Sequence, residues 1–314
     1  MEPAPFHAAL AGAPDGVRSV WLRADDGVRL RAAVWGAGES GQKGTVLLFQ
    51  GRTEYIEKFG PAAGEFTRRG LAMATLDFRG QGLSDRLIPD PALGHVEQFS
   101  DYQRDVAAFV NLLGTLRLPE PWVVLGHSMG GCIALRSLMN GLPVRAAAFS
   151  APMWGVIMPR ALAPVAGLMA TVARLTGRGR KPTPSTSRIN YALTAAFEDN
   201  TLTRDRAMWD FMRRQMTEVP ALAIGAPTMQ WFGAALAEMR ALARRPAPAL
   251  PCYAALGGRE RIVEPAAIHA RMKRWPNGTL DLIAGAEHEL MMELPEVRMR
   301  FYDGVAALFA SAGA

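Results

Sequence analysis

The sequence has little cysteine and no long apolar run. Among its 314 residues there are two cysteines, Cys132 and Cys252. We therefore expect no disulfide scaffold, and we interpret both thiols as small core residues of a protein in a reducing compartment, the cytoplasm. No uncharged run reaches the roughly 20 apolar residues that span a bilayer. Residues 1–20 also lack a basic start followed by an apolar stretch, so no cleaved signal is expected.

Charge of one sign and metal-ligand clusters are also scarce. The 35 Lys and Arg residues exceed the 29 Asp and Glu residues by only six, and no nucleic-acid motif accompanies them, so no nucleic-acid partner is predicted. The chain has five histidines and no Cys–His cluster, so we expect neither a metal nor another cofactor. Hydrophobic residues make up 49%, which is typical of a globular chain. The oligomeric state stays open.

Short apolar segments alternate with helical patterns along most of the chain. The first two β-rich segments are separated by Asp25-Asp26-Gly27, which predicts a hairpin at the edge of a sheet. The later alternation predicts an α/β protein with a mostly parallel, doubly wound sheet. The strands are expected over 17–22, 28–35, 45–49, 72–76, 122–125, 145–149, 252–256 and 280–283, and the helices over 57–69, 102–116, 129–139, 265–274 and 295–309.

The alternation stops in the middle of the chain. From Ser150 to about Ala247 the pattern is helical, without a convincing strand, and it is far longer than an ordinary connection of ~2 to 6 residues. We therefore predict a first core part over residues 1–150, an inserted helical cap over 151–247 and a second core part over 248–314.

One five-residue motif carries the chemistry. Gly126-His127-Ser128-Met129-Gly130 matches the G-x-S-x-G nucleophile elbow, with an apolar strand before it and a helix after it. The strained turn requires small residues at positions 126 and 130. Ser128 is therefore the predicted nucleophile, although a glycine-rich turn with an inert serine is the alternative.

A serine nucleophile needs a histidine base that follows it in the chain. His7 and His95 precede Ser128, His127 lies in the elbow, and His269 falls within a helical pattern. His288 remains, in a loop after the last predicted strand, where the carboxyl edge of a parallel sheet binds ligands. The alternative is an exposed loop histidine without a catalytic role.

A carboxylate should orient that histidine from the loop after residues 252–256. Glu260 is our choice, and Glu264 is the rival, although its place before Pro265 fits a helix start. No Asp or Glu occurs between Ser150 and Phe197, which removes the other usual place for the acid.

An oxyanion hole would complete the site. Its donors are expected to be the backbone N–H groups of Arg52, after the strand at 45–49, and Met129, at the start of the helix behind the elbow. The Arg52 side chain could separately serve as a surface salt-bridge partner.

Together these motifs resemble the serine α/β-hydrolases of the monoacylglycerol lipase and bacterial lysophospholipase group. The resemblance implies an α/β-hydrolase fold with a helical cap, no cofactor, and hydrolysis of lipid-like acyl esters through an acyl-enzyme on Ser128. Two positions depart from the group's pattern: Glu260 stands where Asp is usual, and Gln50 where His is common. The stretches that carry the likeness are residues 50–55, 77–84, 94–102, 126–131 and 285–290.

The predicted cap contains an apolar stretch, Ala161 to Ala173, followed by a run rich in Arg and Lys. It could be a lid that makes peripheral contact with a membrane, or a helix packed over the site beside a solvated basic loop. An esterase for small soluble esters, a C–C hydrolase, a peroxidase and a non-catalytic binding protein remain alternatives on the same fold.

Overall fold

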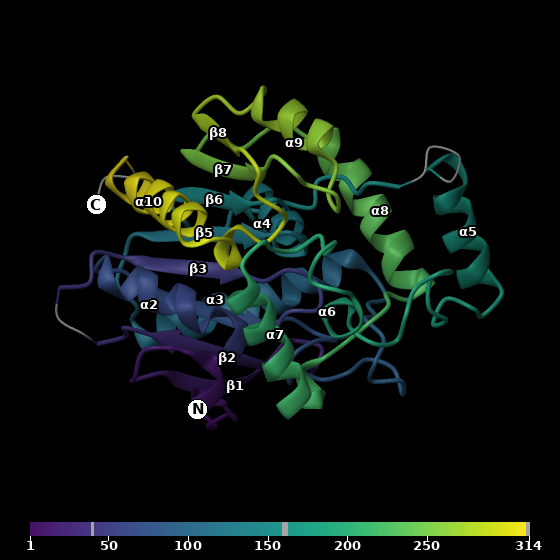
Figure 1. Ribbon diagram of the computed structural model, residues 1–314, viewed down its shortest axis with the longest axis horizontal. Helices are drawn as coiled ribbons and strands as arrows, with labels where there is room; N and C mark the ends of the chain where they lie inside the picture. The colour runs from purple at the N-terminus through teal and green to yellow at the C-terminus, as the bar shows by residue number, and fades with distance from the viewer. Residues whose placement is uncertain (39–40, 159–162, 312–314) are drawn as a thin grey trace.

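The computed structural model describes residues 1–38, 41–158 and 163–311. These residues form one eight-stranded sheet with helices on both faces (Figure 1). The strands are β1 (Arg18–Arg23), β2 (Arg29–Trp35), β3 (Thr45–Phe49), β4 (Ala72–Asp77), β5 (Trp122–His127), β6 (Ala146–Ser150), β7 (Cys252–Gly257) and β8 (Gly278–Ile283).

The helices follow in chain order. The α-helices are α1 (Ala8–Ala11), α2 (Gly60–Arg68), α3 (Tyr102–Leu116), α4 (Met129–Met139), α5 (Ala163–Leu175), α6 (Tyr191–Thr194), α7 (Arg206–Glu218), α8 (Met229–Ala243), α9 (Pro265–Met272) and α10 (Pro295–Ser311). The 3-10 helices are η1 (Ile56–Phe59), η2 (Phe99–Asp101), η3 (Pro220–Leu222) and η4 (Leu290–Met292).

The sheet has the order β1-β2-β4-β3-β5-β6-β7-β8. β2 pairs antiparallel with both β1 and β4, and the other neighbours pair parallel. This confirms the mostly parallel sheet and the edge hairpin. β3 and β6 are buried along their whole length and β5 from its second residue on, as apolar strands covered by helices on both faces should be.

Two hydrophobic layers cover the sheet. Alternate residues of the strands pack against α3, α4 and α9 on one face and against α2 and α10 on the other. Val46 and Leu48 of β3, for example, face the second layer, whereas Leu47 and Phe49 face the first. Cys132 and Cys252 are buried, unpaired core residues, as predicted. No helix in the described part of the chain is long and apolar enough to cross a bilayer.

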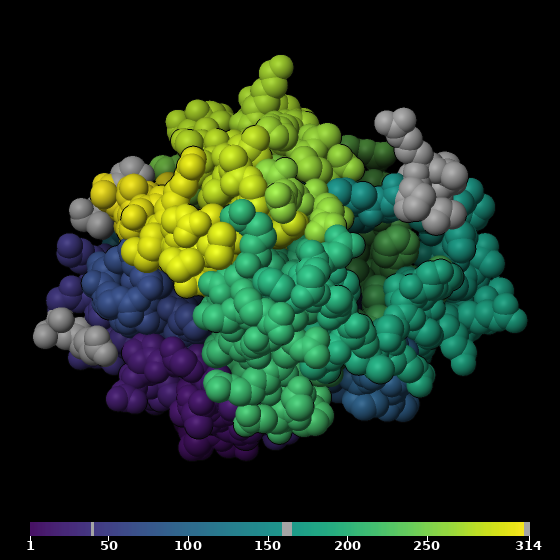
Figure 2. All heavy atoms as spheres, in the orientation of Figure 1, coloured from purple at the N-terminus to yellow at the C-terminus, as the bar shows by residue number. Residues whose placement is uncertain are grey.

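Residues 151–251 contain no strand within the described ranges and supply α5 to α8. Figure 2 shows a hollow in the surface between the parts around α5 and α7, with α8 visible at depth. α5 packs on α8: a Cβ on Gly233 would lie 2.6 Å from Ala170. The first two residues of the apolar stretch predicted at 161–173 lie outside the described residues.

A buried cation fixes the N-terminal half of the sheet. Arg31 on β2 donates hydrogen bonds to Asp77 at the end of β4 and to both oxygens of Glu57 in η1, and all three side chains are fully buried. Burial would lower the pKa of Arg31, but the two carboxylates raise it above its ordinary value. β2, β4 and η1 are thus joined by one ion-pair cluster.

We expect Arg31→Met to lower the free energy of unfolding by about 3–5 kcal/mol, because it leaves two buried carboxylates without their cation. Urea denaturation followed by tryptophan fluorescence measures the change. Arg18→Met, at an exposed position of the adjacent strand β1, should stay within about 0.5 kcal/mol of the parent. Equal midpoints for the two variants would contradict the expectation.

Candidate active site

Ser128 lies at a strained turn between β5 and α4. Its backbone has φ 48° and ψ −118°, a conformation that residues other than glycine rarely adopt. The turn is possible because its neighbours are small: a Cβ on Gly130 would lie 1.9 Å from the Phe49 carbonyl oxygen, and one on Gly126 would lie 2.7 Å from Gly131. The predicted elbow geometry is therefore present, and it projects Ser128 into a pocket.

His288 and Glu260 are in direct contact. Nδ1 of His288 lies 2.8 Å from Oε2 of Glu260, and both side chains are buried. The other oxygen of Glu260 accepts hydrogen bonds from the N–H groups of Ile262 and Val263, at 2.7 and 3.0 Å. Burial would raise the pKa of Glu260, but His288 and these N–H donors lower it below its ordinary value. The carboxylate is thus held ionised against the ring.

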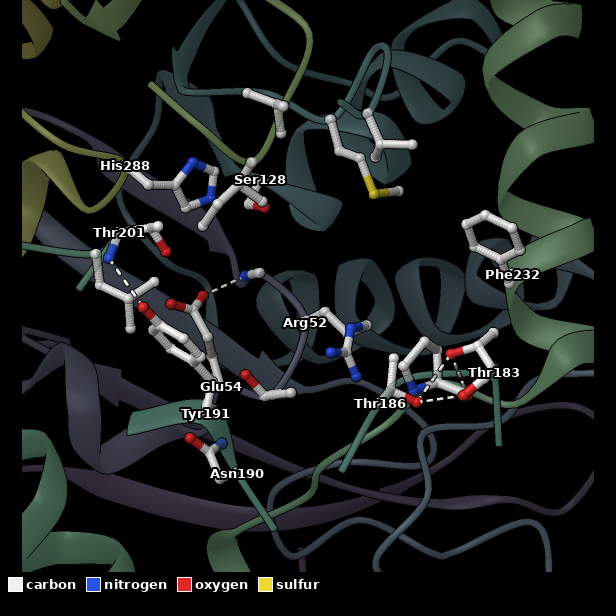
Figure 3. A pocket seen from close by; sticks show the side chains of 18 of the residues that line it. Arg52, Glu54, Ser128, Thr183, Thr186, Asn190, Tyr191, Thr201, Phe232 and His288 are labelled. Atoms are coloured by element: carbon white, nitrogen blue, oxygen red, sulfur yellow. Dashed lines mark hydrogen bonds between the residues drawn. The ribbon is translucent and has the colours of Figure 1, made fainter. Parts of the chain in front are cut away.

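This contact orients His288 toward the serine. A carboxylate at Nδ1 fixes the proton there, which leaves Nε2 as the acceptor in the neutral ring. Figure 3 shows Ser128 and His288 side by side at the wall of the pocket. Glu264 instead occupies the N-cap position of α9, and His269 lies within that helix. Of the two candidate acids, only Glu260 contacts the histidine.

The two predicted oxyanion donors are both available. Met129 is the first residue of α4, and first-turn N–H groups have no partner within their own helix. Arg52 lies in the turn after β3, and in the described part of the chain its backbone N–H has no acceptor. Gly51, by contrast, donates its N–H to the carboxylate of Glu54.

A buried ion-pair network lies beside these groups. The ammonium of Lys58 contacts the carboxylates of Glu54 and, at 2.8 Å, Glu289. Nε2 of His127 lies 3.3 Å from Glu289, and its Nδ1 lies 3.1 Å from the Ser150 carbonyl oxygen. The His127 and His288 rings are 5.0 Å apart. The network therefore joins the loops after β3, β5 and β8.

The charges in this network stabilise one another. Burial would raise the pKa of Glu289, but Lys58 and His127 lower it well below its ordinary value. Burial would lower the pKa values of Lys58 and His127, but the two carboxylates raise them. Ligand atoms of Glu54, His127 and Glu289 lie within 4.8 Å of one another, as in a metal site. The Lys58 ammonium already supplies the positive charge that a metal would bring.

Sequence reasoning did not assign a role to any member of this network. Glu54 and Glu289 lie in the motifs that carried the resemblance, and His127 was noted only as part of the elbow. The spacing of Glu54 and Lys58, four residues apart, is a signal for a local ion pair. Nothing local indicates the contact between Lys58 and Glu289, which depends on the fold.

The pocket is a cavity of about 890 Å³ with a mainly apolar wall. This volume is in the range of pockets for small molecules. Core loops contribute Arg52, Ser128 and His288, and the segment after β6 contributes most of the apolar wall. The methionine, tryptophan and phenylalanine side chains of that wall are Met153, Met158, Met169, Met212, Met216, Met229, Trp231 and Phe232.

Comparison with known proteins identifies relatives over most of the chain. A family model described as serine aminopeptidase, S33, matches residues 40–295. The probable lysophospholipase L2 of Haemophilus influenzae is 28% identical over 262 residues, which cover 83% of this chain and 82% of that protein. Lysophospholipase L2 of Escherichia coli is 31% identical over 272 residues, which cover 81% of this chain and 76% of that protein.

Solved structures confirm the predicted α/β-hydrolase fold. A soluble variant of monoglyceride lipase from Saccharomyces cerevisiae, in complex with a substrate analog, has a TM-score of 0.74 at 18% identity and covers 99% of this chain and 100% of its own. A carboxyl esterase from Bacillus coagulans has a TM-score of 0.75 at 12% identity, with 95% and 99% covered.

We expect Lys58→Met to loosen the loops that the network joins, because it leaves two buried carboxylates without their cation. Amide hydrogen exchange should become faster in peptides that contain Gly51 and His288, and the free energy of unfolding should fall by about 3–5 kcal/mol.

The stabilisation by Glu289 should depend on pH. Because folding lowers the pKa of Glu289, its contribution to the free energy of unfolding is present above the ordinary carboxylate range. That contribution is lost as the pH falls through the folded pKa.

Lys43→Met is the matched control, because Lys43 is exposed and precedes β3, at the opposite end of that strand from the loop with Gly51. Unchanged exchange at Gly51 and His288 in Lys58→Met would show that the network does not hold the loops together.

Proposed function

Because the chain belongs to the serine aminopeptidase family of hydrolases, with lysophospholipases among its relatives, we propose that it hydrolyses the acyl ester of lysophospholipids or monoacylglycerols. Ser128, His288 and Glu260 form the catalytic triad in this proposal. The observation that carries it is the buried contact between His288 and Glu260 beside a strained serine at the wall of a large apolar pocket.

The reaction begins when the Ser128 hydroxyl attacks the ester carbonyl and passes its proton to Nε2 of His288. Glu260 stabilises the imidazolium that forms. The N–H groups of Arg52 and Met129 bind the negative charge that develops on the carbonyl oxygen. His288 then protonates the leaving alcohol. In the second half, His288 takes a proton from water, which attacks the acyl carbonyl, and then returns the proton to Ser128 as the fatty acid leaves.

The apolar wall supports a lipid substrate. Its methionines adapt to a flexible chain, and Trp231 and Phe232 offer flat apolar surfaces. Monoacylglycerol lipase of Mycolicibacterium smegmatis matches about a third of this chain at 32% identity. Its name refers to one of the two lipid esters proposed here as substrates. We assign residues 151–247 as a cap between two core parts, 1–150 and 248–314, since the cap supplies most of this wall.

The exposed side of α5 supports peripheral membrane contact. Ala166 and Ala170 are buried, whereas Leu168, Val172 and Leu175 are 64%, 49% and 72% exposed. α5 therefore has features of both a packed helix and a membrane-contacting lid, since one side packs against the protein and the other is apolar and exposed. Three exposed cations lie at the end of α5 and just after it, namely Arg174, Arg178 and Lys181. Such cations attract anionic headgroups. We place the protein in the cytoplasm, at the inner face of the membrane.

The enzyme should release fatty acid from palmitoyl-lysophosphatidylethanolamine and monopalmitoylglycerol faster than from short soluble esters. Ser128→Ala should lower kcat by on the order of a millionfold and abolish labelling by a fluorophosphonate probe. Glu260→Gln should lower kcat by on the order of ten-thousandfold, because the imidazolium loses its counter-charge. Titration of the released fatty acid measures kcat for both variants.

Ser100→Ala, an exposed serine outside the pocket, is the control and should keep full activity. Preference for short esters in the parent enzyme would disprove the lipid substrate while leaving the triad intact. Equal fluorophosphonate labelling of Ser128→Ala would disprove the nucleophile.

The double variant Leu168→Asp/Leu175→Asp should bind less to vesicles that contain phosphatidylglycerol, because it places charge on the apolar side of α5. Co-sedimentation measures binding, and hydrolysis of a short soluble ester should stay unchanged. Leu282→Asp, at a half-exposed position of β8, is the control. Equal vesicle binding by all three proteins would refute contact through α5.

A further inference from the structure

The side chain of Arg52 lines the pocket without a carboxylate partner. Its Nη1 donates to the Gly225 carbonyl oxygen at 2.7 Å, and its Cζ lies 5.6 Å from the centre of the Trp231 ring. Within the described ranges the Arg52 side chain forms no ion pair, and the bond to Gly225 is its only hydrogen bond. A guanidinium has five N–H donors, so most of its capacity is unused.

Burial has a clear effect on this cation. It lowers the pKa of Arg52 to about 10, and only the hydroxyl of Tyr102 opposes the shift. Two almost fully buried arginines have carboxylates, since Arg31 contacts Glu57 and Asp77 and Arg79 contacts Asp105 at 2.7 Å. The buried Arg271 instead donates to two carbonyl oxygens, whereas Arg52 has one. Arg52 is partly exposed to the pocket, and a cation with limited access to water and no counter-charge is stabilised when an anion joins it.

The acidic residues of the pocket do not supply that anion. Glu54 and Glu289 both line the pocket, but their carboxylates contact Lys58, and His127 lies against Glu289. This network is close to balanced by itself. The guanidinium of Arg52 is therefore the excess positive charge in the pocket lining.

The position of Arg52 relates this charge to the ester. In the view of Figure 3 its side chain extends from the loop near Ser128 toward the side where Thr183 and Thr186 lie, and away from His288. The backbone N–H of the same residue is the proposed oxyanion donor. In a lysophospholipid, glycerol carbons separate the ester from the phosphate, a span similar to that of the Arg52 side chain between its N–H and its guanidinium.

We propose that the guanidinium of Arg52 binds the phosphate of a lysophospholipid headgroup whose ester lies at Ser128. The inference rests on the proposed function and deepens it, since it makes phosphate the feature that distinguishes the preferred substrate from a neutral monoacylglycerol. A guanidinium fork suits a phosphate because it makes two parallel, charge-assisted hydrogen bonds. Trp231 forms the flat surface beside it.

The test compares kcat/KM for palmitoyl-lysophosphatidylethanolamine and monopalmitoylglycerol in the same mixed micelles of nonionic detergent. Arg52→Gln should lower the ratio of the two values by about ten- to a hundredfold, the range for a lost hydrogen bond to a charged group. Arg52→Lys should give an intermediate ratio, because it keeps the charge but loses the fork. Any disturbance of the oxyanion loop affects both substrates and cancels in the ratio.

Arg244→Gln is the matched control, because it removes one positive charge from an exposed position outside the pocket, and it should leave the ratio unchanged. An unchanged ratio in Arg52→Gln would overturn the proposal and leave Arg52 as a structural link to Gly225. Arg52-dependent inhibition by inorganic phosphate, without a change in the ratio, would mean a free-anion site and would also overturn it. If the parent enzyme cleaves neither lipid, the proposed function itself fails.

Discussion

The contact of Lys58 with two buried carboxylates is the interaction on which the site depends. Glu54 follows β3, Glu289 follows β8, and His127, which lies against Glu289, ends β5. One ammonium thus connects three strand ends that carry the proposed oxyanion loop, the proposed nucleophile and the proposed histidine base. Each charge is out of water and each depends on the others, so the loops share one arrangement. A catalytic geometry needs this rigidity because its groups must be in place before the substrate arrives.

The sheet supplies the frame for that network. β5 lies between β3 and β6 with parallel pairing on both sides, which fixes the height at which Ser128 leaves the sheet. The strained turn at Ser128 is stable because glycines let α4 approach Phe49 closely. The energy stored in this turn is offset by the packing of β5 and α4, both almost wholly buried. The hydroxyl of the proposed nucleophile is thus held by two well-buried elements.

The pocket combines two environments with different tasks. Near Ser128 it is polar and charged, with His288 and the Lys58 network, whereas the wall from the segment between β6 and β7 is rich in methionine and aromatic side chains. An acyl chain is suited to the second environment and an ester to the first. Arg52 lies between them, and its partnerless charge gives the pocket a preference that an apolar wall alone could not provide. Specificity for a charged group of this kind arises because a buried ion is unfavourable without its counter-ion.

Most strands and helices were predictable because each follows a local pattern. α3 and α4 begin and end at the predicted residues, since helical periodicity is encoded locally in the chain. Some element ends differ because tertiary pairing extends a strand, as in β5, which continues to His127 through its pairing with β6. The segment predicted as one helix at 57–69 is divided into η1 and α2. There Glu57 turns toward Arg31, a contact that no local pattern shows.

The sequence by itself determined the class of the sheet, predicted the elbow at Ser128, and restricted the candidate histidine to His288 and the candidate acid to Glu260 or Glu264, because chain order and motif context leave few residues. Only the tertiary structure decided which acid touches His288, which charges surround Lys58, and that Arg52 lines the pocket without a carboxylate partner. Glu260 and Glu264 are near neighbours of the same chemistry, and distance alone separates them. Lys58 meets Glu289, and Arg52 meets Gly225, across most of the chain. Electrostatic interactions depend on distance and burial, and folding is what sets both.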